Sequence, residues 1–168
     1  PAGEAEQASA FVPPIASGVE DSPPAPGQIR LLRPSEPVTR DRLIYAAVLA
    51  EDEADRLLVA PYGRFSEPAL PGELLTGRTS ACLRVLCVWN GRWLPRSLAR
   101  DSWLVDLMTE QERQEALAVW KMLEEGGGPP PDAETRVGPP VQHPADPRKD
   151  YQAEESATMD SLAACQSV

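Results

Sequence analysis

The centre of the chain reads Leu43-Ile44-Tyr45-Ala46-Ala47-Val48-Leu49-Ala50, then Glu51-Asp52-Glu53-Ala54-Asp55, then Leu57-Leu58-Val59-Ala60. Two apolar runs joined by a short acidic segment are typical of a β-hairpin with buried strands and a solvated turn. A helix over residues 43–58 is the alternative, because this stretch is rich in Ala and Leu and contains no helix breaker. We predict the hairpin, and we interpret its turn carboxylates as solvated side chains rather than ligands of a cation.

Apolar segments on both sides of this hairpin extend a β-rich domain. Residues 27–33 predict a first strand, and residues 102–107 predict a last short strand. Residues 83–94 predict a second hairpin, because Asn90-Gly91 suits a type I′ turn, in which both positions need a positive φ. Residues 61–77 form a loop between the hairpins. A loop of that length is often functional in a compact domain.

A helix is predicted after the last strand. Thr109-Glu110-Gln111-Glu112 has the pattern of a capping box, in which the Thr109 hydroxyl and the Glu112 carboxylate each satisfy a backbone amide. Apolar residues then recur at helical spacing until Gly126, which suits the residue after a helix end. The predicted fold class is therefore mainly β, with five or six strands closed by one C-terminal amphipathic helix.

Both ends of the chain differ from this core in composition. Residues 1–26 and 126–168 hold 13 of the 19 prolines, and each segment has a net charge of −4. Such segments lack the apolar content that offsets the entropy of ordering. We predict a disordered Pro-rich N-terminal tail over 1–26, a folded domain over 27–125, and a disordered acidic tail over 126–168. The alternative for residues 151–168 is a short helix that forms on binding a partner.

The composition excludes several classes of protein. The chain has 168 residues and a net charge of −10, and no apolar run approaches the roughly 20 residues that a membrane span needs. The single His, at position 143, lies in a Pro-rich stretch, so we expect no Ser-His-Asp triad, and one His is too few for a multi-His metal site. No glycine-rich phosphate-binding motif occurs. We therefore expect no metal and no cofactor.

The cysteines and the N-terminus indicate where the protein resides. Cys82 and Cys87 lie in an apolar run, as buried free thiols do in a reducing compartment. The first residues show no charged segment followed by an apolar one, so we expect no signal peptide. Together these features predict a cytoplasmic protein.

The order of the elements resembles the MazF/PemK-like family of small SH3-like barrels, which includes toxin endoribonucleases. Gly27-Gln28-Ile29 resembles the opening strand of that family, residues 42–48 its next strand, and residues 57–61 the strand that ends near a Pro. Thr109-Glu110-Gln111-Glu112 resembles the start of its closing helix. The resemblance covers residues 27–125. It implies an SH3-like barrel, a possible homodimer, and cleavage of single-stranded RNA without a metal.

The positions that carry catalysis in that family are only partly present. Arg40 or Arg42 stands where the resemblance implies the family's first Arg, and Arg64 is the next candidate cation. The Thr or Ser expected just after Pro61 is missing, and Ser66 is the nearest hydroxyl. Arginine can stabilise the charge of a phosphorane, but the reaction also needs a base, and no residue here is an obvious one.

A second group of residues suits binding rather than catalysis. Arg with interleaved aromatic residues is used both in single-stranded RNA grooves and at protein interfaces. The alternative is a core containing the Trp residues, with solvated Arg on the outer faces. The candidate binding surface comprises Tyr62, Arg64, Phe65, Arg84, Trp89, Arg92, Trp93 and Arg96.

Two functional hypotheses follow from the sequence. The first is a non-catalytic, protein-binding regulator on a MazF/PemK-like barrel, because the hydroxyl and base positions are incomplete while the Arg and Trp residues are retained. For this hypothesis the resemblance implies a sigma factor, in a stress or defence operon, or an antitoxin-like protein as the partner. The second is an endoribonuclease toxin with an eroded motif. An unrelated small β-barrel is the third possibility.

Overall fold

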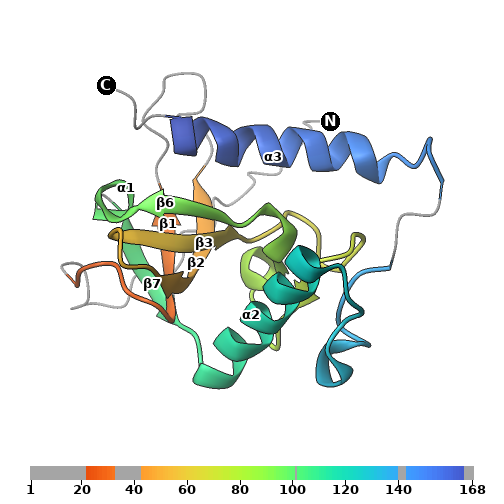
Figure 1. Cartoon of the computed structure of the whole chain (residues 1–168), viewed down its shortest axis with the longest axis horizontal. Helices are drawn as coiled ribbons and strands as arrows, with labels where there is room; N and C mark the ends of the chain where they lie inside the picture. The colour runs from red at the N-terminus through yellow and green to blue at the C-terminus, as the bar shows by residue number, and fades with distance from the viewer. Residues whose placement is uncertain (1–21, 33–42, 101, 140–142, 165–168) are drawn as a thin grey trace, which may run out of the picture.

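The main sheet has five antiparallel strands in the order β6-β3-β2-β1-β7 (Figure 1). The computed structural model describes residues 22–32, 43–100, 102–139 and 143–164. The mainly β class is confirmed, and seven strands lie in the described ranges rather than five or six. The strands of the main sheet are β1 (Gln28–Leu32), β2 (Ile44–Glu51), β3 (Arg56–Pro61), β6 (Arg92–Pro95) and β7 (Trp103–Leu107).

The predicted central hairpin is confirmed as β2 and β3. Leu58 and Ala60 of β3 pack in the cluster that contains the core of helix α2 (Glu110–Glu125), whereas Leu57 and Val59 pack in a second cluster on the other face. Both faces of these strands are therefore buried. This explains why their sequences are continuously apolar and do not alternate with polar residues. In the turn, the Asp52 carboxylate accepts hydrogen bonds from backbone amides.

Helix α2 begins and ends as the sequence predicts. The Glu112 amide donates to the Thr109 hydroxyl at 3.1 Å, and the Thr109 amide donates to the Glu112 carboxylate at 2.6 Å. Gly126 ends the helix with a φ of 73°, in the left-handed region that favours glycine. Ala116 and Val119 are fully buried against the sheet.

The predicted hairpin at Asn90-Gly91 is wrong. Residues Val88–Asn90 form the 3-10 helix η3, and Gly91 is extended, with a φ of −61°. Strand β5 (Val85–Cys87) pairs instead with β4 (Glu73–Leu75) in a second sheet, while β6 pairs with β3. Glycine is required at 91 for another reason: a Cβ there would lie 2.7 Å from the Trp120 ring of α2.

The C-terminal segment differs from the disorder expected for residues 126–168. Residues Arg148–Ala164 form helix α3, and its Met159 and Leu162 are buried in the second cluster. The last proline of the chain is Pro147, so the features that predicted disorder end where the helix begins. Residues 1–21 of the predicted N-terminal tail lie outside the described residues.

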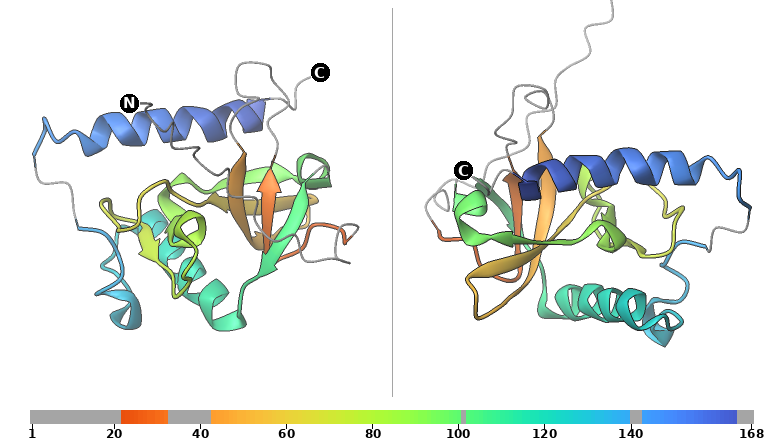
Figure 2. Two further views of the ribbon diagram at one scale, coloured as in Figure 1. Left: turned by 180° about the vertical axis from the view of Figure 1, so that it is seen from behind. Right: turned by 45° about the horizontal axis from the view of Figure 1, so that its top comes forward.

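Helices α2 and α3 lie on opposite sides of the main sheet (Figure 2). The remaining described helices are short: α1 (Arg96–Arg100) and the 3-10 helices η2 (Ala81–Leu83) and η4 (Pro131–Ala133). In the described part of the chain, no helix combines the length and the apolar character that crossing a membrane requires.

Candidate functional site

A pocket of about 590 Å³ lies where the start of β2 and the end of β3 meet helix α3. Antiparallel pairing places Ala46 opposite Pro61, and the Tyr62 amide donates to the Tyr45 carbonyl at 2.7 Å. The residues that follow β3 therefore lie beside the residues that begin β2. The side chains lining this pocket include Tyr45, Arg64, Cys82, Asn90, Glu155 and Met159.

Three side chains of the β domain hold the middle of α3. Arg64 forms an ion pair with Glu155 at 2.6 Å, and the Asn90 side-chain amide donates to the Glu155 carbonyl at 2.9 Å. Arg92 donates to the Asp160 carboxylate at 3.0 Å and to the Ser156 hydroxyl at 2.8 Å. We call Arg64, Asn90 and Arg92 the basic face. It binds one side of an acidic helix through side-chain and backbone acceptors.

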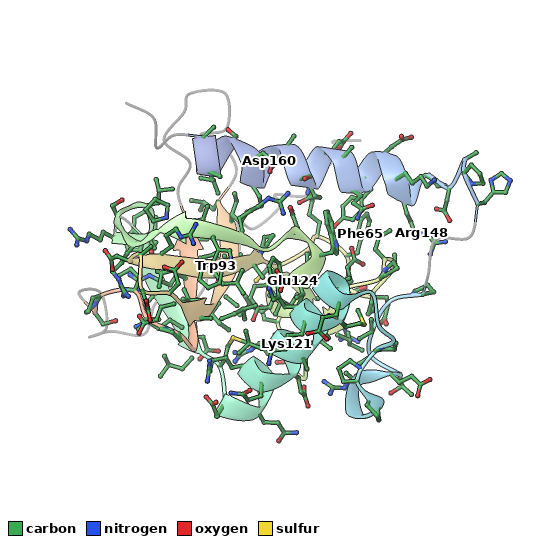
Figure 3. All side chains as sticks on the ribbon, viewed as in Figure 1. Phe65, Trp93, Lys121, Glu124, Arg148 and Asp160 are labelled. Atoms are coloured by element: carbon green, nitrogen blue, oxygen red, sulfur yellow. The ribbon has the colours of Figure 1, made fainter. Side chains whose placement is uncertain are left out.

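The first turn of α3 contacts the loop after β3. Arg148 pairs with Asp146 and donates to the Ala69 carbonyl at 2.7 Å. Phe65 packs edge-on against Tyr151, with 5.0 Å between the ring centroids, although about half of Phe65 is exposed. Figure 3 shows Phe65 and Arg148 near one end of α3 and Asp160 near the other. The contacts therefore extend along most of the helix.

Buried groups under α3 have perturbed proton affinities. Burial raises the pKa of the Cys87 thiol, which neighbours the Tyr151 hydroxyl, and burial also raises the pKa of Tyr151. A Cβ at Gly63 would lie 2.9 Å from the Cys87 sulfur and 3.4 Å from the Tyr151 hydroxyl oxygen. Both groups are therefore neutral near pH 7, and helix α3 approaches the β domain closely at Gly63.

The structure brings only some of the predicted binding residues to one place. Arg64 and Arg92 both bind α3, and Phe65 contacts its first turn. Tyr62 is buried, and burial raises the pKa of its phenol. Arg84, which follows η2, donates to the Ser66 carbonyl at 2.9 Å and so binds the loop after β3.

The remaining predicted residues have other partners. The Trp89 indole approaches the buried Glu73 carboxylate at 3.4 Å, and Trp93 lies under the Arg56 guanidinium at 5.7 Å from the ring centroid. Arg96 binds Asp55 at 2.7 Å, in the turn of the central hairpin. Among the described residues, these three form no hydrogen bond, ion pair or ring contact with α3. Arg40 and Arg42 lie outside the described residues.

Several residues of the site were not identified from the sequence. The sequence predicts Asn90 in a turn and places Arg148, Glu155 and Asp160 in a disordered tail. A signal was nevertheless present: residues 151, 155, 159 and 162 are spaced by four, four and three, which places Tyr151, Glu155, Met159 and Leu162 on one side of a helix.

The pocket offers little acid–base chemistry. Its lining includes no His and one carboxylate, Glu155, which pairs with Arg64. Burial raises the pKa of Tyr45 as well as that of Tyr62, so neither phenol ionises near neutral pH. Among the described residues, no group of three or more His, Cys, Asp or Glu is placed to hold a metal ion. The arrangement suits recognition of an acidic ligand better than proton transfer.

Comparisons with known proteins find similarity only to solved structures. Family models yield no match, and neither do curated proteins. Two solved structures from Deinococcus radiodurans are similar in chain path, a MazE-MazF crystal structure (Form-II) and a MazF crystal structure (Form-I). Each has a TM-score of 0.49 and 15% identity, and each alignment covers 62% of this chain. The alignments cover 97% and 99% of those chains, respectively.

Proposed function

We propose that this chain is a non-catalytic, protein-binding module whose basic face recognises an acidic amphipathic helix of a partner protein. The observation that carries this proposal is the occupation of the basic face by α3. After its first two residues, α3 contains four acidic side chains and no basic one. A surface that fits such a helix within its own chain has the charge and shape to fit one from another protein.

The contacts with α3 define what the partner helix must contain. It needs a carboxylate opposite Arg64 and a second carboxylate about one turn and a half further along opposite Arg92. It also needs one apolar side chain between the two carboxylates and another after the second, as Met159 and Leu162 are placed in α3. A sigma factor or an antitoxin-like protein carrying such a segment would meet these requirements. The homodimer implied by the resemblance stays a prediction, which light scattering on the full chain would test.

The direct test uses a labelled peptide of residues 146–164 as the acidic helix. The protein is the full chain with Met159→Asp, because a charge at this buried position detaches the chain's own α3. We expect the peptide to bind, as measured by fluorescence anisotropy. Adding Arg64→Glu with Arg92→Glu should weaken binding at least about tenfold, because two ion pairs become repulsive.

The control is Arg84→Glu, a single charge reversal on the same domain at a residue whose partners are Ser66 and Glu67 and not α3. Its binding of the peptide should be unchanged. Failure of the peptide to bind the Met159→Asp protein, or equal loss of binding in the control, would show that the basic face does not recognise acidic helices.

An endoribonuclease is the second candidate function. The observation that favours it is the position of Arg64, half-exposed at a pocket, where a guanidinium could bind a phosphate. The test is incubation of the full chain with mixed single-stranded RNA in the absence of metal. We expect no cleavage. Cleavage that is lost in Arg64→Ala, or in Arg40→Ala with Arg42→Ala, would establish the enzyme instead.

A further inference from the structure

Helix α3 is held on the β domain by few buried contacts. Met159 and Leu162 are its buried side chains in the described structure. Its ion pairs are only partly buried: Asp160 is 61% exposed against 29% for Arg92, and Arg64 is 51% exposed against 13% for Glu155. Exposed ion pairs contribute little to stability. The ion pairs therefore make the binding of α3 specific, but the two buried apolar side chains contribute limited binding free energy.

The fit between α3 and the strands beneath it is incomplete. The pocket of about 590 Å³ lies between the helix and the ends of β2 and β3. The Asn90 side-chain oxygen is buried there and accepts no hydrogen bond from the described residues. The pocket is partly open to solvent and α3 leaves it unfilled, whereas the unsatisfied buried acceptor costs stability. A helix with a larger side chain at the pocket and a donor for Asn90 would bind this surface better than α3 does.

The connection to α3 permits it to leave while it stays attached. The chain is fixed as far as Gly138, whose amide donates to the Glu73 carbonyl at 3.0 Å, and α3 begins at Arg148. The nine residues between them span up to about 30 Å when extended, more than the width of a helix. A short tether also maintains a millimolar effective concentration of its own helix. The basic face is thus occupied by default.

We infer that α3 is a built-in competitor that occupies the basic face until a better-fitting acidic helix displaces it. This inference rests on the proposed function and adds a regulatory step to it. The apparent affinity for a partner is the intrinsic affinity reduced by the small fraction of molecules in which α3 has left. Changes that weaken only α3 must then strengthen partner binding, although they touch no residue of the basic face.

The test compares peptide 146–164 binding to three forms of the full chain. Wild type should bind most weakly. Glu155→Ala with Asp160→Ala should bind about threefold to tenfold more tightly, because two partly exposed ion pairs that hold α3 are lost. Met159→Asp should bind at least about thirtyfold more tightly. Glu154→Ala, an exposed acid outside these contacts, is the control and should bind like wild type.

The outcomes separate this inference from the proposed function. The predicted order of affinities supports both. Equal binding by all forms would leave the basic face as a binding surface but would overturn the role of α3 as a competitor. Absence of binding in every form would overturn both proposals.

A second readout does not depend on a partner. Cys87 is 2% exposed and lies against Tyr151 of α3, so its alkylation reports departure of the helix. In a Cys82→Ser, Cys165→Ser background, we expect alkylation to accelerate in the order wild type, Glu155→Ala with Asp160→Ala, and Met159→Asp. Equal rates in the three proteins, with circular dichroism unchanged, would show that α3 does not leave the β domain.

Discussion

Helices α2 and α3 have nearly the same length and cover opposite faces of one sheet, yet they are held in different ways. Helix α2 is capped at both ends, and its partly buried side chains add to the buried Ala116 and Val119. Helix α3 has two buried side chains and depends on polar contacts with Arg64, Asn90 and Arg92. Both faces of the sheet are buried, but the face of α2 carries the larger hydrophobic cluster, and we propose that the helix on the other face can be displaced.

The largest expected difference comes from placing the same charge on each helix. Val119→Asp should cost more than about 4 kcal/mol and abolish cooperative unfolding, because the carboxylate is buried in the core without a partner. Met159→Asp, also at a buried position, should leave the domain folded and detach only α3. Thermal unfolding and hydrogen exchange would measure the two effects. Loss of the thermal transition in both proteins would mean that the folded domain depends on α3 as much as on α2.

Adjacent leucines on β3 test the same contrast at the sheet. Leu58→Ala, on the side of α2, should destabilise the domain by about 3–5 kcal/mol, because fixed surroundings leave a cavity. Leu57→Ala, on the side of α3, should cost about 2–3 kcal/mol, because a loosely held helix can settle into the space. Urea unfolding with unchanged slope gives both values. A larger cost for Leu57→Ala would reverse the ranking of the two faces.

The cap of α2 should have a smaller effect. Thr109→Ala removes the hydroxyl that accepts from the Glu112 amide and should cost about 1 kcal/mol. Thr158→Ala in α3 is the control: its hydroxyl donates to the Glu154 carbonyl within the same helix, so little change is expected. Thermal denaturation of both variants would measure the difference, and equal melting temperatures would argue against the cap.

Lowering the pH should have the smallest effect on stability, and this effect should be similar at the start of α2 and just before α3. Hydrogen bonds from Arg113 lower the pKa of Glu110 to about 2, and those from Arg148 lower the pKa of Asp146 to about 2. A lowered pKa in the folded state stabilises the fold above the ordinary carboxyl pKa, and this contribution is lost as the pH falls from about 4 towards 2. Carboxyl NMR shifts should show these midpoints, and midpoints near 4 would contradict the pairings.

The sequence predicted the elements whose signals are local. The central hairpin, the strand at residues 103–107 and α2 are each specified by apolar runs or caps within a few residues. The prediction of a hairpin at Asn90-Gly91 was wrong because tertiary contacts decide which strands pair. Strand β6 pairs with the edge of β3, and Trp120 fills the space beside Gly91. Local turn chemistry carries no information about either contact.

The candidate site was predicted in part for a similar reason. Charge and residue type pointed to Arg64 and Arg92, which do share a surface. The same criteria also selected Trp93 and Arg96, whose partners Arg56 and Asp55 lie elsewhere. The site is organised by α3. The Pro and Gly residues that precede this helix led the sequence analysis to predict disorder there. Helix α3 has few apolar residues, and they are buried only because they pack against β2 and β3, a contact that the sequence alone does not reveal.

The packing of Gly91 against Trp120 has a consequence for how this surface could evolve. Asn90 and Arg92, on either side of Gly91, both bind α3, whereas Gly91 packs against Trp120 of α2. Three successive residues therefore contact both helices. A substitution at 91 collides with α2, whereas changes at 90 or 92 alter what is recognised. Arg64 stands apart from this constrained tripeptide, and its side chain is half-exposed. Diversification towards new partners should therefore begin at residue 64 and its loop, and residue 91 should be the last to vary.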